Sequence, residues 1–209
     1  MEQAKLYRQA FFLSIFTIFY NIIEGLASVY FGIEEETLTL FGFGMDSFIE
    51  AISGFGIAHM VIRIKNNKGS GIDQFEITAL KITGTAFYLL SFFLAVGIVM
   101  NLINKESPQS TLPGIIISVF SILVMLVLVK MKNKVGKQLN SAPILADASC
   151  TRVCIYMSLV LLGSSLLHEL FKINYIDILG TIGIIYYSIL EGKESFAKAK
   201  GIHACSCGH

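Results

Sequence analysis

The chain has 209 residues, of which 54% are hydrophobic and only 15% are charged, and its formal net charge is +1. A soluble domain carries about 25% charged residues, so this composition excludes an ordinary soluble protein, and the near-neutral charge gives no support for a nucleic-acid partner. The mean hydropathy of +0.68 indicates a chain surrounded mostly by lipid.

A helix needs about 20 mainly apolar residues to cross a membrane. Six segments along the chain qualify as such helices. We predict an all-α, multi-pass membrane protein with one transmembrane domain over residues 1–192 and a short tail over residues 193–209. The compact connections favour a bacterial inner membrane, with lipid as the surrounding partner. The expected spans are residues 9–32, 37–62, 78–103, 113–129, 142–167 and 175–190.

The connections between these spans differ in charge. Twelve Lys and Arg residues occur in the N-terminal segment, the second and fourth connections and the tail, including Lys130, Lys132, Lys134 and Lys137 in the fourth. The opposite side has only Lys105, Lys172 and the acidic run 34–36. Because positive residues stay on the cytoplasmic side, both termini are predicted to be cytoplasmic.

Several ionisable residues interrupt the apolar spans. Each costs about 2.5–3.5 kcal/mol near the centre of a membrane helix, so each needs a partner or a function. They are Glu24 in the first span, Asp46 and Glu50 in the second, and Asp147 and Arg152 in the fifth.

Two pairs of candidate metal ligands share the same helical spacing. Asp46 and Glu50 are four residues apart, as are Cys150 and Cys154, so each pair lies on one helix face. Antiparallel second and fifth spans would place Asp46 level with Cys154, and Glu50 level with Cys150. We therefore predict one ion bound by two carboxylates and two sulfurs near the bilayer midplane.

This set of ligands suits a soft divalent ion. Zn²⁺ takes four ligands, with Zn–S bonds of about 2.3 Å, and thiolates favour Zn²⁺ or softer ions such as Cd²⁺ over Mg²⁺ and Ca²⁺. A membrane cannot hold four uncompensated negative charges, so we expect the ion-free site to be largely protonated. Metal binding would then release protons, which makes protons the expected counter-ion.

Three further polar residues are candidates for supporting roles around this ion. Asp147 extends the stripe of the two cysteines, and Glu24 shares a face of the first span with Asn21. Glu24 and Asn21 are interpreted as a gate, a proton relay or a helix-packing pair. Arg152 is expected to neutralise Asp147 or Glu24.

The C-terminal tail combines four potential ligands in seven residues, and such Cys/His tracts often bind metal. It is interpreted as a second, cytoplasmic metal site, and the alternative is a disordered end with incidental cysteines. The residues are His203, Cys205, Cys207 and His209.

Three segments resemble the cation diffusion facilitators. Residues 137–148 form a basic loop followed by Ser, a short apolar stretch and Ala-Asp-Ala, similar to the start of that family's fifth helix. Residues 44–50 resemble its second helix, with an acidic pair four apart, and Asp177 with residues 191–194 resembles its sixth. The resemblance covers nearly the whole chain and implies six helices with both termini in the cytoplasm.

The resemblance also implies a tetrahedral metal site formed by Asp46, Glu50, Cys150 and Cys154. The family usually has His or Asp at the position of Cys150 and Asp at the positions of Cys154 and Glu50, so sulfur here implies a softer site. We expect no counterpart of the family's cytoplasmic ferredoxin-like domain after the sixth span. A homodimer is therefore expected to form through the membrane helices, with the Cys/His tail taking over metal sensing.

These observations predict a transporter rather than an enzyme, one that exports a soft divalent metal ion in exchange for protons by alternating access. A membrane metal sensor that does not transport remains an alternative. A thiol redox enzyme using Cys150 and Cys154 is a weaker one, because redox motifs favour the spacing Cys-x-x-Cys.

Overall fold

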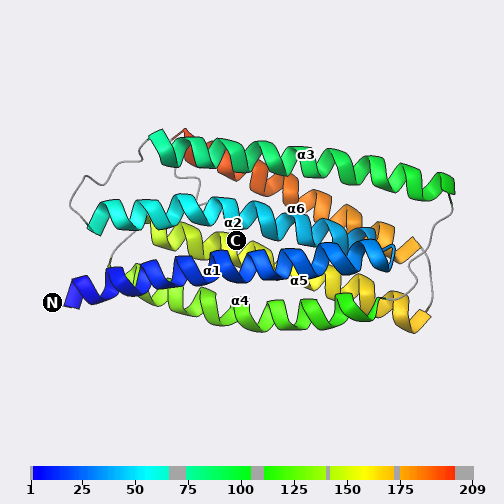
Figure 1. Cartoon of the computed structure of the whole chain (residues 1–209), viewed down its shortest axis with the longest axis horizontal. Coiled ribbons are helices and arrows are strands. Elements are labelled where there is room, and N and C mark those ends of the chain that lie inside the picture. Colours follow the sequence, from blue (N-terminus) through cyan, green and yellow to red (C-terminus); the bar gives the residue numbers. More distant parts are fainter. Residues whose placement is uncertain (1, 66–73, 105–110, 140–141, 172–174, 201–209) are drawn as a thin grey trace.

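The structure is a computed structural model that describes residues 2–65, 74–104, 111–139, 142–171 and 175–200. All the regular elements in these residues are helices, so the predicted all-α fold is confirmed. The helices run side by side in alternating directions, and the start of α1 and the end of α6 lie at the same end of the bundle (Figure 1). They are α1 (Glu2–Glu34), α2 (Leu38–Lys65), α3 (Gln74–Asn104), α4 (Leu112–Gln138), α5 (Ala142–Phe171) and α6 (Tyr175–Ala199).

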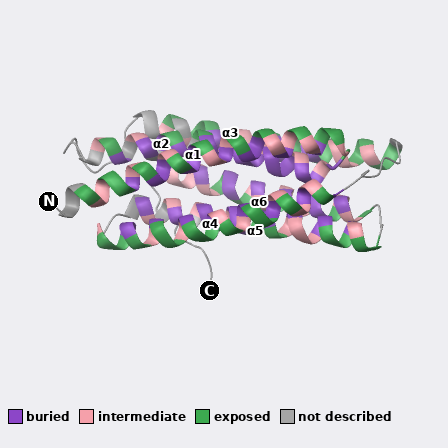
Figure 2. Ribbon diagram, turned by 60° about the horizontal axis from the view of Figure 1, so that its bottom comes forward, coloured by how far each residue is buried: buried purple, intermediate pink, exposed green. Residues whose placement is uncertain are grey.

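Polarity is distributed as expected for a protein in lipid. Large apolar side chains such as Phe19 and Ile23 face outward, whereas Asn21 and Ser28 on the same helix are completely buried. Figure 2 shows this division, with exposed residues on the outer faces of the helices and buried residues between them. The polar groups therefore face the bundle interior, where they can find partners that lipid cannot offer.

Among the described residues, five helices, α1 to α5, are long and apolar enough to cross a membrane. The sixth expected span is not among them, and the apolar stretch of α6 is bounded by the buried acids Asp177 and Glu191. α6 nevertheless packs inside the bundle against α2, α3 and α5.

The largest extensions beyond the C-terminal ends that the hydropathy pattern predicts are those of α4 and α6. α4 was expected to end near Val129, but it continues to Gln138, so the four lysines predicted in a connection lie on the helix instead. α6 continues past Leu190 to Ala199. Hydropathy detects only the part of a helix that crosses the hydrocarbon, so the charged turns beyond it were missed. They form a projecting, lysine-rich end of the bundle.

α2 is the central element of the bundle and packs against α1, α3, α5 and α6. Glycines allow its close contact with α1: a Cβ atom at Gly44 would come within 2.7 Å of the backbone nitrogen of Val29, and one at Gly32 within 2.6 Å of that of Phe41. Small residues at a helix interface serve this purpose in membranes.

The start of α2 is fixed to α6 by a buried acid. Asp177 accepts hydrogen bonds from the backbone nitrogens of Leu38 at 3.0 Å and Thr39 at 3.2 Å. These are free donors of the first helical turn. The contact fixes α6 against α2 at the end of the bundle opposite the lysines.

Candidate metal site between α2 and α5

The central acids of α2 face the cysteine stripe of α5. The thiol of Cys154 donates a hydrogen bond to Glu50 Oε1, which joins the two helices directly. Asp46, one turn away on α2, is only 1% exposed and lies within electrostatic reach of both Glu50 and Cys154. Its Oδ1 atom has no hydrogen-bond partner among the described residues. Two of the four predicted ligands, Glu50 and Cys154, are therefore in direct contact, and Asp46 is buried one turn away on α2.

The register between α2 and α5 differs from the prediction by about one helical turn. Glu50 was expected to lie level with Cys150, but its contact is with Cys154. The expected level was inferred from the midpoints of apolar segments. These midpoints cannot resolve one turn, about 5.4 Å, because side-chain packing sets the register.

The fourth predicted ligand has a different neighbour. The Cys150 sulfur accepts a hydrogen bond of 2.7 Å from Lys198 Nζ, and Lys198 also forms an ion pair of 2.8 Å with Glu194. Within the part of the chain that the structure describes, no three His, Cys, Asp or Glu residues are arranged to hold a metal ion. Convergence of all four ligands on one ion therefore remains a prediction.

Two residues of α1 support the acids of α2. Asn21 is completely buried, and its Nδ2 atom donates a hydrogen bond of 3.2 Å to Glu50 Oε2. Glu24 accepts hydrogen bonds from the hydroxyls of Tyr20 at 2.9 Å and Ser47 at 3.0 Å. Asn21 thus contacts a predicted ligand directly, whereas Glu24 is connected to α2 through Ser47.

Asp147 belongs to a separate buried cluster. It forms an ion pair of 3.0 Å with Lys132 of α4, and Lys132 also donates a hydrogen bond of 2.9 Å to Thr151. The expected pairing of Asp147 with Arg152 is wrong, because Arg152 is exposed and the buried ammonium of Lys132 neutralises the carboxylate. Glu24 likewise has hydroxyl partners instead of Arg152.

Three charged residues near the site were not predicted to belong to it, because they lie outside the expected apolar spans. Lys132 and Lys198 are those just described, and Glu191 is a buried acid of α6 within electrostatic reach of Asp46 and Glu50. Glu191, Glu194 and Lys198 have helical spacing, which would have revealed one face if α6 had been extended beyond Leu190.

The candidate tail site of His203, Cys205, Cys207 and His209 lies outside the described residues.

Polar interiors, apolar outer faces and a buried group of acids and thiols define a multi-pass membrane protein with chemistry suited to cations. The sequence model for the cation efflux transmembrane domain matches residues 11–200. The chain therefore belongs to the cation efflux family, which consists of metal-cation transporters rather than enzymes. No curated protein matches the chain.

Proposed function

We propose that this transporter exports a soft divalent metal ion, Zn²⁺ or Cd²⁺, from the cytoplasm in exchange for protons. The ion would be bound by Asp46 and Glu50 of α2 and by Cys150 and Cys154 of α5. The observation that carries this proposal is the direct contact between Glu50 and Cys154, which brings an oxygen and a sulfur ligand from two helices together inside the bundle.

The choice of ion follows from the chemistry of these ligands. Two sulfurs bias the site against Mg²⁺ and Ca²⁺, which prefer oxygen ligands alone. The two carboxylates supply the negative charge that a divalent cation needs in a medium of low dielectric constant. The unpartnered oxygen of Asp46 supports this role, because a buried polar atom without a hydrogen bond is costly unless it serves a ligand.

Proton exchange follows from the contact between Glu50 and Cys154. A proton lies between the sulfur and the carboxylate in the ion-free protein, and a metal ion binds a thiolate and not a thiol. Binding of the ion between these two atoms therefore displaces that proton. This displacement is the physical basis for coupling export of the metal to movement of protons in the opposite direction.

Binding at Cys150 requires a movement of α6 or of one of its side chains. The ammonium of Lys198 donates a hydrogen bond to the sulfur of Cys150. Its positive charge would repel a metal ion that binds the same sulfur. We propose that Lys198 leaves Cys150 when the ion arrives, so that the fourth ligand joins the other three. Movement of α6 away from α5 would couple this step to alternating access.

The direction of transport is argued from charge. The lysine-rich ends of α4 and α6 are on the same side as the start of α1 (Figure 1), and basic residues favour the cytoplasmic side. The metal would therefore arrive from this end and leave at the opposite one.

We also propose that two copies associate through their exposed apolar helix faces.

The proposal is tested with purified protein in liposomes that contain a pH-sensitive dye and a metal-sensitive dye. Uptake of Cd²⁺ with proton movement in the opposite direction is expected for the unmodified chain, and Asp46→Asn should abolish both signals. Glu34→Gln, at an exposed position at the end of α1, removes the same charge and should leave both signals unchanged. Stoichiometric Cd²⁺ binding without uptake would contradict transport and favour a sensor.

A further inference from the structure

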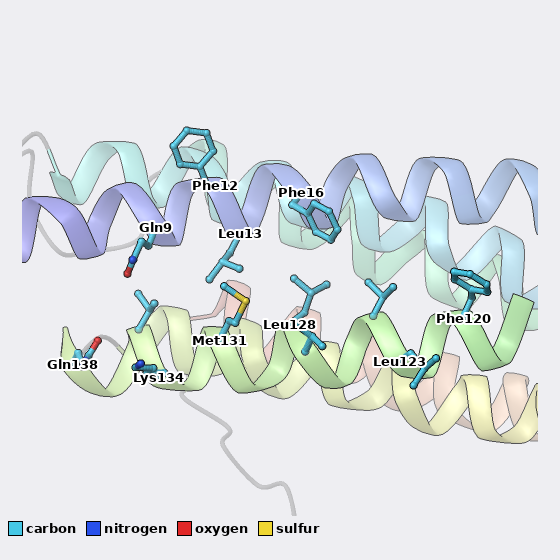
Figure 3. Close-up of a pocket in the computed structure, with 13 residues that line it drawn as sticks. Gln9, Phe12, Leu13, Phe16, Phe120, Leu123, Leu128, Met131, Lys134 and Gln138 are labelled. Carbon is cyan, nitrogen blue, oxygen red and sulfur yellow. The ribbon is translucent and has the colours of Figure 1, made fainter.

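A long groove lies on the outer face of the bundle between α1 and α4, away from the acids and cysteines of the candidate site. Its volume is about 820 Å³, and it is open to the surroundings along the membrane-spanning parts of both helices. Figure 3 shows apolar side chains along most of its length. Phe12, Phe16, Phe120 and Val127 are each more than half exposed, so the protein itself leaves this groove uncovered.

One end of the groove is polar and basic. Gln9 of α1 and Lys134 and Gln138 of α4 lie together at this end in Figure 3, whereas Phe120 and Leu123 lie at the other. None of the 13 described residues that line the groove is acidic. The guanidinium of Arg8 lies over the ring of Phe12, 5.5 Å from its centroid, so a second positive charge is in contact with a residue that lines the groove.

The groove is long enough to cross the hydrocarbon of one half of a bilayer. Phe120 and Lys134 are about 21 Å apart along α4 at 1.5 Å per residue, whereas one leaflet of the hydrocarbon core is about 15 Å thick. A chain that begins beside Lys134 would therefore cross its own leaflet within the groove. The basic end belongs to the same end of the bundle as the other lysines of α4, where the cytoplasmic leaflet supplies anionic lipids.

We propose that this groove binds one anionic phospholipid, with its phosphate beside Lys134 and Arg8 and an acyl chain along the apolar part between α1 and α4. The amides of Gln9 and Gln138 supply additional hydrogen-bond donors for the head group. Charge complementarity favours a lipid over a helix of a second copy, because a helix packed here would bury Lys134 and both amides against an apolar surface.

Native mass spectrometry of the purified protein tests the proposal, with phosphatidylglycerol and phosphatidylcholine added in equal amounts. The unmodified chain should retain phosphatidylglycerol preferentially. Lys134→Gln should weaken this retention about fivefold, and Arg8→Gln should weaken it further by a similar factor. Lys193→Gln removes the same charge from an exposed position of α6 outside the groove and should have no effect.

A second variant tests the apolar part of the groove. Val127→Trp fills the groove from an exposed position and should reduce retention of both lipids without preventing folding. Equal retention of the two lipids by the unmodified chain, or identical behaviour of Lys134→Gln and Lys193→Gln, would overturn the proposal. So would a Val127→Trp variant that retains lipid but dissociates a dimer, because the groove would then be an interface between copies.

Discussion

Replacement of Asn21 by alanine tests how the carboxylate of Glu50 is held in position for the ion. In the structure, Asn21 Nδ2 donates a 3.2 Å hydrogen bond to Oε2, while the other oxygen, Oε1, is in contact with Cys154. The two partners therefore occupy different oxygens, and the amide can hold the carboxylate while Oε1 binds the ion. Without the amide, Glu50 must be ordered by the metal itself.

The magnitude follows from the kind of contact that is lost. A hydrogen bond to a charged group contributes about 1.5–3 kcal/mol, and loss of a residue that orients a metal ligand costs about 10- to 100-fold in affinity. Both figures predict that Asn21→Ala weakens Cd²⁺ binding by about 10- to 100-fold. Equilibrium dialysis of the purified protein in detergent measures this directly.

The control variant is Ser28→Ala, which removes another completely buried polar side chain from the same helix, one with no contact to Glu50. Ser28→Ala should bind Cd²⁺ like the unmodified chain. Thermal unfolding of both variants separates loss of the site from loss of the fold. If Asn21→Ala binds Cd²⁺ normally while Glu50→Gln does not, the amide does not position the ligand and the reasoning fails.

Three other substitutions have defined outcomes. Cys154→Ser should weaken Cd²⁺ binding more than Zn²⁺ binding in competition dialysis, because oxygen is a harder ligand than sulfur, and an equal loss for both ions would contradict a sulfur ligand. Lys198→Met should strengthen Cd²⁺ binding, since the competing ammonium is gone; an unchanged Cd²⁺ affinity in equilibrium dialysis would refute the competition. Lys132→Met should destabilise the protein by about 3–5 kcal/mol in denaturant unfolding, because it leaves the carboxylate of Asp147 without its buried counter-ion, and Lys132→Met combined with Asp147→Leu should recover most of the loss.

The helices could be predicted from the sequence because lipid imposes a simple condition on it. A segment that crosses the hydrocarbon must be apolar over about 20 residues, and the acids and cysteines of α2 and α5 stand out against that background. The residues of the candidate site were recognised for this reason. Their helical spacing placed each pair on one face of its helix, and Glu50 and Cys154, one residue from each pair, are in contact.

The neighbours of these residues could not be predicted in the same way. Lys132 and Lys198 lie on helical turns beyond the apolar segments, where hydropathy gives no sign that a lysine returns into the bundle. Both have long aliphatic stems that allow the ammonium group to reach a buried partner. The register between α4, α5 and α6 determines which acid or thiol each lysine reaches. No pattern in the single sequence shows this register.

The contacts around the candidate site give its buried acids and thiols partners inside the bundle. Glu50 has Asn21 and the thiol of Cys154 as partners, and Cys150 has Lys198. In the proposed mechanism, the net affinity for a metal ion equals the free energy of binding the ion minus the free energy of breaking the contacts that compete with it. Lys198 and the shared proton compete for atoms that the ion would use, whereas Asn21 binds an oxygen that the ion leaves free. This distinction predicts opposite effects of the two substitutions, weaker binding for Asn21→Ala and stronger binding for Lys198→Met, although each removes one hydrogen bond to a proposed ligand.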